Sequence, residues 1–146
     1  MLSSVSIIIP TYNSEKFISK ALESIKRQSF QAYEVIIVDA GSVDKTKDIC
    51  ESYDEKFIFH ELKGSNQGEA RNLGVSKASG ELVMFLDSDD MLSDDNVLTE
   101  CTQKVAECDS DFYNFAVSFV KNKEVVRNVP APKELHVISR DKILRL

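Results

Sequence analysis

Residues 80–90 read Gly-Glu-Leu-Val-Met-Phe-Leu-Asp-Ser-Asp-Asp, and this stretch decides the fold that we expect. Its apolar part, Leu82 to Leu86, has the length of a strand and is nearly free of polar residues. A continuous apolar run of this kind predicts a strand that is buried on both faces, as in a parallel sheet covered by helices. The acidic residues 87–90 then follow the carboxyl end of that strand.

Three further strands are predicted upstream of this stretch, and helical segments separate them. The strands are expected at residues 5–9, 34–38 and 57–60. Apolar residues at helical spacing predict helices that carry Phe17 to Ile25, Ile49 to Tyr53 and Ala70 to Ala78, with Ser14 as a candidate cap of the first. This alternation predicts right-handed βαβ units and therefore an α/β fold, Rossmann-like, with a mostly parallel sheet and helices on both faces.

The pattern changes after residue 95. Ser93 is expected to cap a helix that carries Val97 to Cys108, with Asp94 and Asp95 in its acidic first turn. A β-hairpin region is predicted next, followed by a short strand and the start of a helix; the ranges are 112–120 with 124–129, 135–138, and from Ser139 onward. We therefore expect one domain over residues 1–146, with a βαβ core at 1–95 and the remaining elements at 96–146.

Composition excludes several classes of protein. The chain has 146 residues, of which 42% are hydrophobic and 29% charged, so it is neither disordered nor fibrous. A net charge of −6 does not favour binding to nucleic acid. No apolar run has the length of about 18 residues that a membrane helix needs. The three cysteines are odd in number and show no C-x-x-C spacing, which indicates free thiols in a reducing compartment.

The acidic residues after the fourth predicted strand are the first candidate site. Two carboxylates about 4 Å apart repel each other by roughly 4 kcal/mol at an effective dielectric constant of 20. Such crowding at a strand end favours a bound cation, and Mg²⁺ or Mn²⁺ would bridge carboxylates to substrate phosphates. We interpret Asp87 and Asp89 as metal ligands on this ground. The alternative is a solvated acidic turn that leads into the next helix.

Other polar residues follow the first two strands, where ligands bind in open α/β sheets. Asp39 either accepts hydrogen bonds from a ribose or base or bonds the amides of its own turn. Residues 10–13, Pro-Thr-Tyr-Asn, form either a ligand loop or an ordinary capped loop. Arg71 lies near the start of its helix, where the macrodipole favours anions, so it indicates a bound diphosphate unless it pairs with Glu69 or another acid.

Four motifs in register then resemble the nucleotide-sugar half of family 2 glycosyltransferases with the GT-A fold. They are SIIIPTYN at 6–13, VIIVDAGSVDKT at 35–46, GSNQGEARNLG at 64–74 and GELVMFLDSDD at 80–90. The resemblance implies a nucleotide pocket lined by Pro10, Thr11, Tyr12, Asn13, Glu15, Asp39, Gly41, Arg71, Asp87 and Ser88. It also implies that Asp87 and Asp89 form a D-x-D pair for Mn²⁺ or Mg²⁺, and it leaves open whether Asp90 shares the ion.

Two departures from this family are visible in the sequence. Ala40 stands where the family usually has a second acid in the motif VDDGS, so one polar contact near the nucleotide is missing. No acid after Asp95 matches the general base that inverting members carry in their acceptor-binding half. We therefore assign no catalytic base within the sequence and expect it beyond Leu146. The expectation is a truncated donor-binding part with little or no transferase activity by itself.

The resemblance implies a UDP- or GDP-sugar donor, a glycan or glycolipid acceptor as in bacterial polysaccharide synthesis, and a cytoplasmic location with peripheral membrane association. The main alternative is a non-catalytic nucleotide-sugar-binding or assembly module. A phosphatase of the haloacid dehalogenase type also has D-x-D after an apolar strand, but that motif normally opens the domain. A dinucleotide dehydrogenase needs a glycine-rich turn after strand one, and residues 10–15 contain no glycine.

Overall fold

The computed structural model describes residues 3–107, 117–121 and 124–129. The chain divides into two compact units, residues 1–104 and 105–146. The first unit contains β1 (Val5–Thr11), α1 (Ile18–Lys26), β2 (Glu34–Asp39), α2 (Thr46–Glu51), β3 (Phe57–Glu61), α3 (Gln67–Lys77), β4 (Leu82–Phe85) and most of α4 (Val97–Glu107). The second contains β5 (Val117–Lys121) and β6 (Glu124–Val129).

The first unit is built on a parallel four-stranded sheet in the order β3-β2-β1-β4. Ile7 of β1 is in register with Val35 of β2 on one side and with Met84 of β4 on the other. The chain therefore adds strands in one direction from β1 through β3 and then crosses back to place β4 beside β1. The strand order reverses between β1 and β4, which is where open α/β sheets bind ligands.

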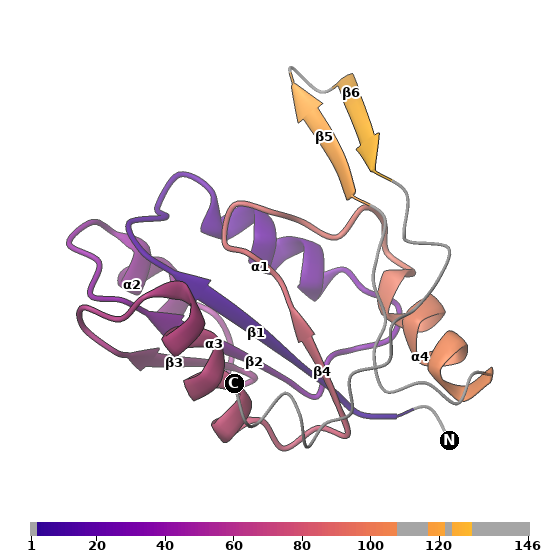
Figure 1. The fold of residues 1–146 in the computed structure, drawn as a ribbon, viewed down its shortest axis with the longest axis horizontal. Helices are drawn as coiled ribbons and strands as arrows, with labels where there is room; N and C mark the ends of the chain where they lie inside the picture. Colours follow the sequence, from indigo (N-terminus) through magenta and orange to yellow (C-terminus); the bar gives the residue numbers. More distant parts are fainter. Residues whose placement is uncertain (1–2, 108–116, 122–123, 130–146) are drawn as a thin grey trace. The chain divides into compact units, whose positions relative to one another are not determined.

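Helices cover both faces of this sheet (Figure 1). On one face α1, α2 and the start of α4 enclose the larger core, in which Ile7, Ile9 and Leu22 are fully buried. On the other face α3 packs on β1 and β2, and its Ala70 belongs to a smaller core with Ile8. β-branched residues suit both faces of these central strands, and all positions of β1 and β2 are buried. The predicted α/β class with helices on both faces is confirmed.

The expectation that the fourth strand is buried on both faces is wrong. Met84 is buried, whereas Val83 is 41% and Phe85 44% exposed. The cause lies in the topology, because β4 forms one end of the described sheet and α3 packs on β1 and β2. The apolar run therefore predicted the strand correctly, but it did not predict that one face of the strand, with Val83 and Phe85, is partly exposed.

Two predicted helix starts also differ from the structure. Ser14 does not cap α1 with its side chain; its carbonyl oxygen accepts hydrogen bonds from the Phe17 and Ile18 amides, and the helix begins at Ile18. Similarly, α4 begins at Val97 and not directly after Ser93, because Asp94 folds the preceding residues into a turn by accepting from the Asn96 amide. In both cases a short turn comes between the predicted cap and the helix.

The second unit holds an antiparallel hairpin, β5 with β6, in which Lys121 pairs with Glu124. This confirms the predicted hairpin within 117–129. The predicted strand residues 112–116, the strand at 135–138 and the helix from Ser139 lie outside the described residues. Among the helices that the structure describes, none combines the length and the apolar character needed to span a membrane.

Gly74 generates a prediction about the packing of α3 on the sheet. A Cβ atom at this position would lie 2.3 Å from Ile8 Cγ2, which is itself fully buried. Overpacking costs about 1–3 kcal/mol, against a gain in helix propensity of about 1 kcal/mol for Gly→Ala. Gly74→Ala is therefore expected to lower the free energy of unfolding in urea by up to about 2 kcal/mol. Ser76→Ala, on the exposed face of the same helix, should change it by less than about 0.5 kcal/mol; equal effects of the two would contradict the packing argument.

Candidate functional site

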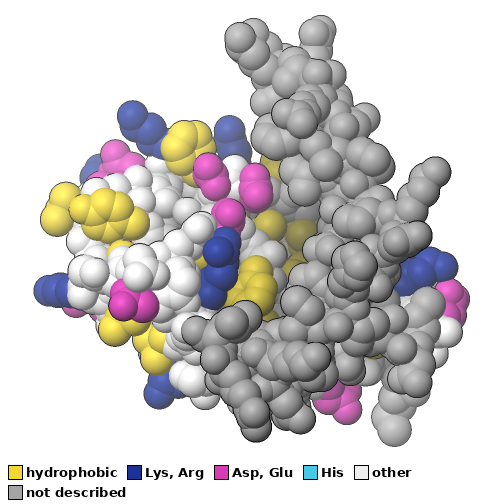
Figure 2. All heavy atoms as spheres, viewed as in Figure 1, with side chains coloured by type: hydrophobic (Ala, Val, Ile, Leu, Met, Phe, Trp, Pro, Cys, Tyr) yellow, Lys and Arg dark blue, Asp and Glu magenta, His cyan; other side chains and the backbone are white. Residues whose placement is uncertain are grey.

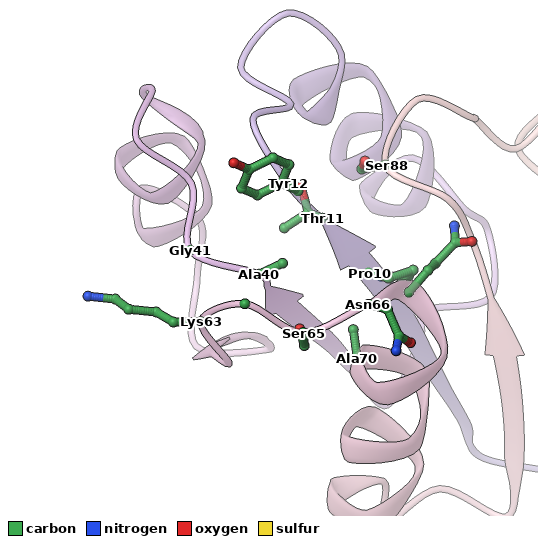
Figure 3. Close-up of a pocket in the computed structure, with 12 residues that line it drawn as sticks. Pro10, Thr11, Tyr12, Ala40, Gly41, Lys63, Ser65, Asn66, Ala70 and Ser88 are labelled. Carbon is green, nitrogen blue, oxygen red and sulfur yellow. The ribbon is translucent and has the colours of Figure 1, made fainter.

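A cavity of about 570 Å³ opens at the carboxyl ends of the strands, beside the position where the strand order reverses. Its walls come from the loops that follow β1, β2, β3 and β4. The lining residues are Pro10, Thr11, Tyr12, Ala40, Gly41, Lys63, Gly64, Ser65, Asn66, Gln67, Ala70 and Ser88. In the view of Figure 3, Tyr12 and Ser88 lie on one side of Ala40 and Pro10, and Ser65 and Ala70 lie on the other.

The loops after β1 and β2 are tied to each other by side chain to backbone hydrogen bonds. Asn13 adopts a left-handed backbone with φ of 48°, which asparagine tolerates, and its Oδ1 accepts from the Val43 amide at 2.9 Å. The Asn13 amide donates to Ser42 Oγ at 2.7 Å, and the Lys45 amide donates to Glu15 Oε2 at 3.1 Å. Asn13 and Glu15, which the resemblance places in the nucleotide pocket, make these bonds between the two loops and are not among the residues that line the cavity.

Asp39 is buried at the end of β2 and organises the turn that follows. Its Oδ2 accepts from the amides of Gly41 and Ser42 at 3.0 and 2.7 Å, and its Oδ1 accepts from the Ser42 hydroxyl. Gly41 has φ of +98°, a conformation that side chains rarely adopt, and it lines the cavity. Of the two interpretations of Asp39, the turn-forming one describes its hydrogen bonds in this structure.

Arg71 pairs with the first aspartate of the acidic stretch. Its guanidinium donates to Asp87 Oδ1 at 2.6 Å, and Gln67 Nε2 donates to the same oxygen at 3.2 Å. The cationic group also lies 5.8 Å from the centre of the Phe85 ring. The arginine near the start of α3 is thus balanced by an acid, as one of the two sequence interpretations allowed, and the acid is Asp87 and not Glu69.

Residues 87–90 form a tight turn, closed by a hydrogen bond of 3.0 Å from the Asp90 amide to the Asp87 carbonyl. Asp89 and Asp90 are exposed, and Figure 2 shows acidic side chains gathered beside a basic one near the centre of the face that it draws. Partial burial and the neighbouring Asp89 and Asp87 raise the pKa of Asp90. The turn therefore concentrates negative charge that only Arg71 offsets through an ion pair within the described residues.

Three buried polar atoms have no hydrogen-bond partner among the described residues: Thr11 Oγ1, Ser65 Oγ and Arg71 Nε. Two of them belong to residues that line the cavity, Thr11 and Ser65. Buried donors and acceptors are rarely left unpaired in proteins, so these two hydroxyls indicate a polar ligand or ordered water in the cavity.

The loop after β3 is the part of this site that we did not predict. Residues 63–67 form one wall of the cavity, although no site residue was predicted from the sequence between Gly41 and Arg71. A signal was present in the sequence, because the polar run from Lys63 to Gln67 comes directly before a helix. The structure uses it as an N-terminal capping box, in which Asn66 and Glu69 bond each other's backbone amides.

The sequence matches the profile of the family described as Glycosyl transferase family 2 over residues 6–142. The chain is 32% identical over 120 residues to glycosyltransferase GlyG of Streptococcus pneumoniae, a match that covers 76% of this chain and 40% of GlyG. It is 37% identical over 132 residues to the poly(ribitol-phosphate) beta-N-acetylglucosaminyltransferase TarS of Staphylococcus aureus, covering 86% of this chain and 22% of TarS. The chain thus spans well under half the length of these relatives.

Solved structures give the same result. TarS residues 1–349 in complex with UDP-GlcNAc superpose with a TM-score of 0.65 at 37% identity, covering 74% of this chain and 32% of that one. The mannosyltransferase PcManGT from Pyrobaculum calidifontis, in complex with GDP-Man and Mn²⁺, gives a TM-score of 0.67 at 25% identity, covering 84% and 36%. The chain belongs to glycosyl transferase family 2.

The raised pKa of Asp90 leads to a prediction for the ligand-free protein. A carboxyl whose pKa is raised by folding destabilises the folded state while it is ionised, and this cost disappears once the pH falls below its ordinary pKa of 3.8. Asp90→Asn is therefore expected to raise the melting temperature at pH 7, with a smaller increase as the pH is lowered. Differential scanning calorimetry from pH 7 to pH 4 tests this, and a stabilisation that grows on acidification would contradict it.

Proposed function

We propose that this chain binds a nucleoside-diphosphate sugar in the cavity and contributes to the metal-assisted, inverting transfer of the sugar to an acceptor hydroxyl. The observation that carries the proposal is the position of the cavity. It opens at the carboxyl ends of the strands, lined by the loops after β1, β2 and β3 and by Ser88 of the acidic turn, beside the reversal of the strand order. Membership of family 2 supports the same reaction class.

The donor is proposed to be a UDP- or GDP-sugar. TarS is bound to UDP-GlcNAc in one solved structure, and PcManGT to GDP-Man in another. A volume of about 570 Å³ lies within the range of about 300–1,000 Å³ that small-molecule sites occupy. The hydroxyls of Thr11 and Ser65, which have no hydrogen-bond partner among the described residues, give the cavity polar groups for a nucleotide.

A divalent ion fits the acidic turn if the nucleotide supplies part of its ligands. Within the described part of the chain, no group of three acidic, histidine or cysteine side chains comes together to hold a metal by itself. Mg²⁺ is commonly held by one or two carboxylates together with substrate phosphates, and Asp89, which is exposed beside the cavity residue Ser88, can offer one. When bound, the metal would stabilise the negative charge of the departing nucleoside diphosphate.

In this arrangement each charged group has its own role. Asp87 is proposed to contact the nucleotide, because its Oδ1 already accepts from Arg71 and Gln67 and its carboxylate is thereby held in place. Asp89 is proposed as the metal ligand, and Asp90 as a further source of negative charge that favours the cation. We assign no catalytic base. The acceptor is proposed to be a glycan or glycolipid, reached by peripheral association with a membrane on the cytoplasmic side.

Titration calorimetry of the purified chain with UDP and GDP, in Mn²⁺ and in EDTA, tests the proposal. Asp89→Asn keeps the size of the side chain and removes its charge. We expect it to abolish most of the gain in affinity that Mn²⁺ provides, because neutral amides are weaker ligands for hard cations.

Glu55→Gln is the matched control, since it removes one negative charge from an exposed position distant from the cavity residues in sequence. It should leave the gain unchanged. Metal-dependent affinity that persists undiminished in Asp89→Asn would refute the assignment of the metal ligand. The alternative of a binding or assembly module without nucleotide recognition predicts no metal-dependent binding of UDP or GDP by the unmodified chain.

A further inference from the structure

The acidic turn is tied to the nucleotide side of the cavity by one pair of serines. Ser14, in the loop between β1 and α1, lies 2.8 Å from Ser88 through the two hydroxyl oxygens. Ser88 lies between Asp87 and Asp89 in the sequence and lines the cavity, whereas Ser14 is 6% exposed and lies behind the wall. The two residues are 74 positions apart in the chain, so this contact joins two different loops.

The direction of this hydrogen bond follows from the second bond that Ser14 makes. Its hydroxyl donates to the carbonyl of Tyr12 at 3.2 Å, and a hydroxyl has one proton and two lone pairs. Ser88 is the donor to Ser14 in the arrangement that satisfies both hydrogen bonds. The lone pairs of Ser88 are then free to accept a hydrogen bond from a ligand in the cavity, while its proton is engaged with Ser14 Oγ.

Ser14 is itself held firmly. Its amide donates to Thr46 Oγ1 at 2.8 Å, at the start of α2, and its carbonyl accepts from the amides of Phe17 and of Ile18, the first residue of α1. The residue is thus connected to two helices as well as to Ser88. The hydrogen bond to Ser14 therefore attaches Ser88 to a fixed point outside its own turn.

The acidic turn needs such an attachment because its charges repel. Asp87 is balanced by Arg71, whereas Asp89 and Asp90 are exposed and form no ion pair within the described residues. Within the described residues, side-chain hydrogen bonds attach this segment to the rest of the chain at three places. Asp87 accepts from Arg71 and Gln67, Ser88 bonds Ser14 and, further along, the Leu92 amide donates to Ser24 Oγ. The Ser14–Ser88 bond is the one that lies next to Asp89.

We propose that Ser14 and Ser88 are positioning residues that couple the nucleotide loop to the metal ligand Asp89. Through their hydrogen bond, the Tyr12–Ser14 loop fixes the backbone from which the Asp89 carboxylate projects. Binding of the nucleotide then raises the affinity for the cation, and binding of the cation raises the affinity for the nucleotide. This inference rests on the proposed function, because it assigns a role within the same donor and metal site.

The test measures the gain in affinity that Mn²⁺ gives, as the ratio of the dissociation constants for UDP or GDP in EDTA and in Mn²⁺. Ser14→Ala should reduce this gain about threefold to tenfold, the range that corresponds to one neutral hydrogen bond. Ser88→Thr keeps the hydroxyl and should retain more of the gain than Ser88→Ala does. Ser76→Ala, which removes a serine hydroxyl from the exposed face of α3, is the matched control and should leave the gain intact.

A double-mutant cycle separates coupling from a general loss of stability. In the Ser88→Ala background, Ser14→Ala should cause no further reduction of the gain, because the bond is already absent. Thermal melting of every variant shows whether it is folded, and if Ser14→Ala does not fold, the comparison of Ser88→Ala with Ser88→Thr decides the question.

The outcomes distinguish this inference from the proposed function. If the unmodified chain shows no Mn²⁺-dependent binding of UDP or GDP, the proposed function and the coupling are both wrong. If it shows that binding and Ser14→Ala retains the full gain, or if the two alanine variants reduce it independently, the coupling alone is overturned. A reduced gain without additivity supports it.

Discussion

The position of β1 between β2 and β4 is the constraint on which the rest of the structure depends. Both neighbours pair with it in parallel, so their carboxyl ends and the loops that follow them meet at one edge. Every residue of β1 is buried, and its isoleucines contribute to the cores on both faces. Because β1 has packed partners on both faces and both edges, it is the fixed element from which the site loops extend.

This constraint explains most of what the sequence predicted correctly and part of what it did not. The isoleucine-rich β1 and β2 and the apolar β4 identified the strands, and the alternation with helices identified a parallel sheet. The cover on Val83 and Phe85 could not be predicted, because it depends on which strands α3 packs against. The starts of α1 and α4 were misplaced for a local reason, since Ser14 and Asp94 form turns that a cap preference alone does not distinguish from a helix start.

In the candidate site, too, the sequence predicted which residues take part but not which partners they contact. Acidic and hydroxyl residues at strand ends were recognisable from their order in the chain, yet their partners were not. Arg71 could have faced a diphosphate or an acid, and only the spatial approach of α3 to the end of β4 brings it to Asp87. Asn13 and Glu15 brace a neighbouring loop for a similar reason, because the bonds that they make depend on the distance between two loops. The wall formed by residues 63–67 requires the arrangement of β3 beside β2.

The two ends of the sheet differ in how their polar groups are satisfied, and this difference locates function at one of them. At the amino ends of the strands, the buried Glu34 accepts from the Ser6 hydroxyl and the Ser79 amide, and the Gly80 amide donates to Ser6, so this network is closed. At the carboxyl ends, Thr11 Oγ1, Ser65 Oγ and Arg71 Nε are buried and have no hydrogen-bond partner in the part of the chain that the structure describes. An unpaired buried polar group costs about 1–3 kcal/mol, whereas a closed network of this kind needs no ligand. A polar ligand would therefore pair buried groups at the cavity edge, whereas the opposite edge has its polar groups already paired. The acidic turn beside the cavity favours a ligand that binds together with a cation.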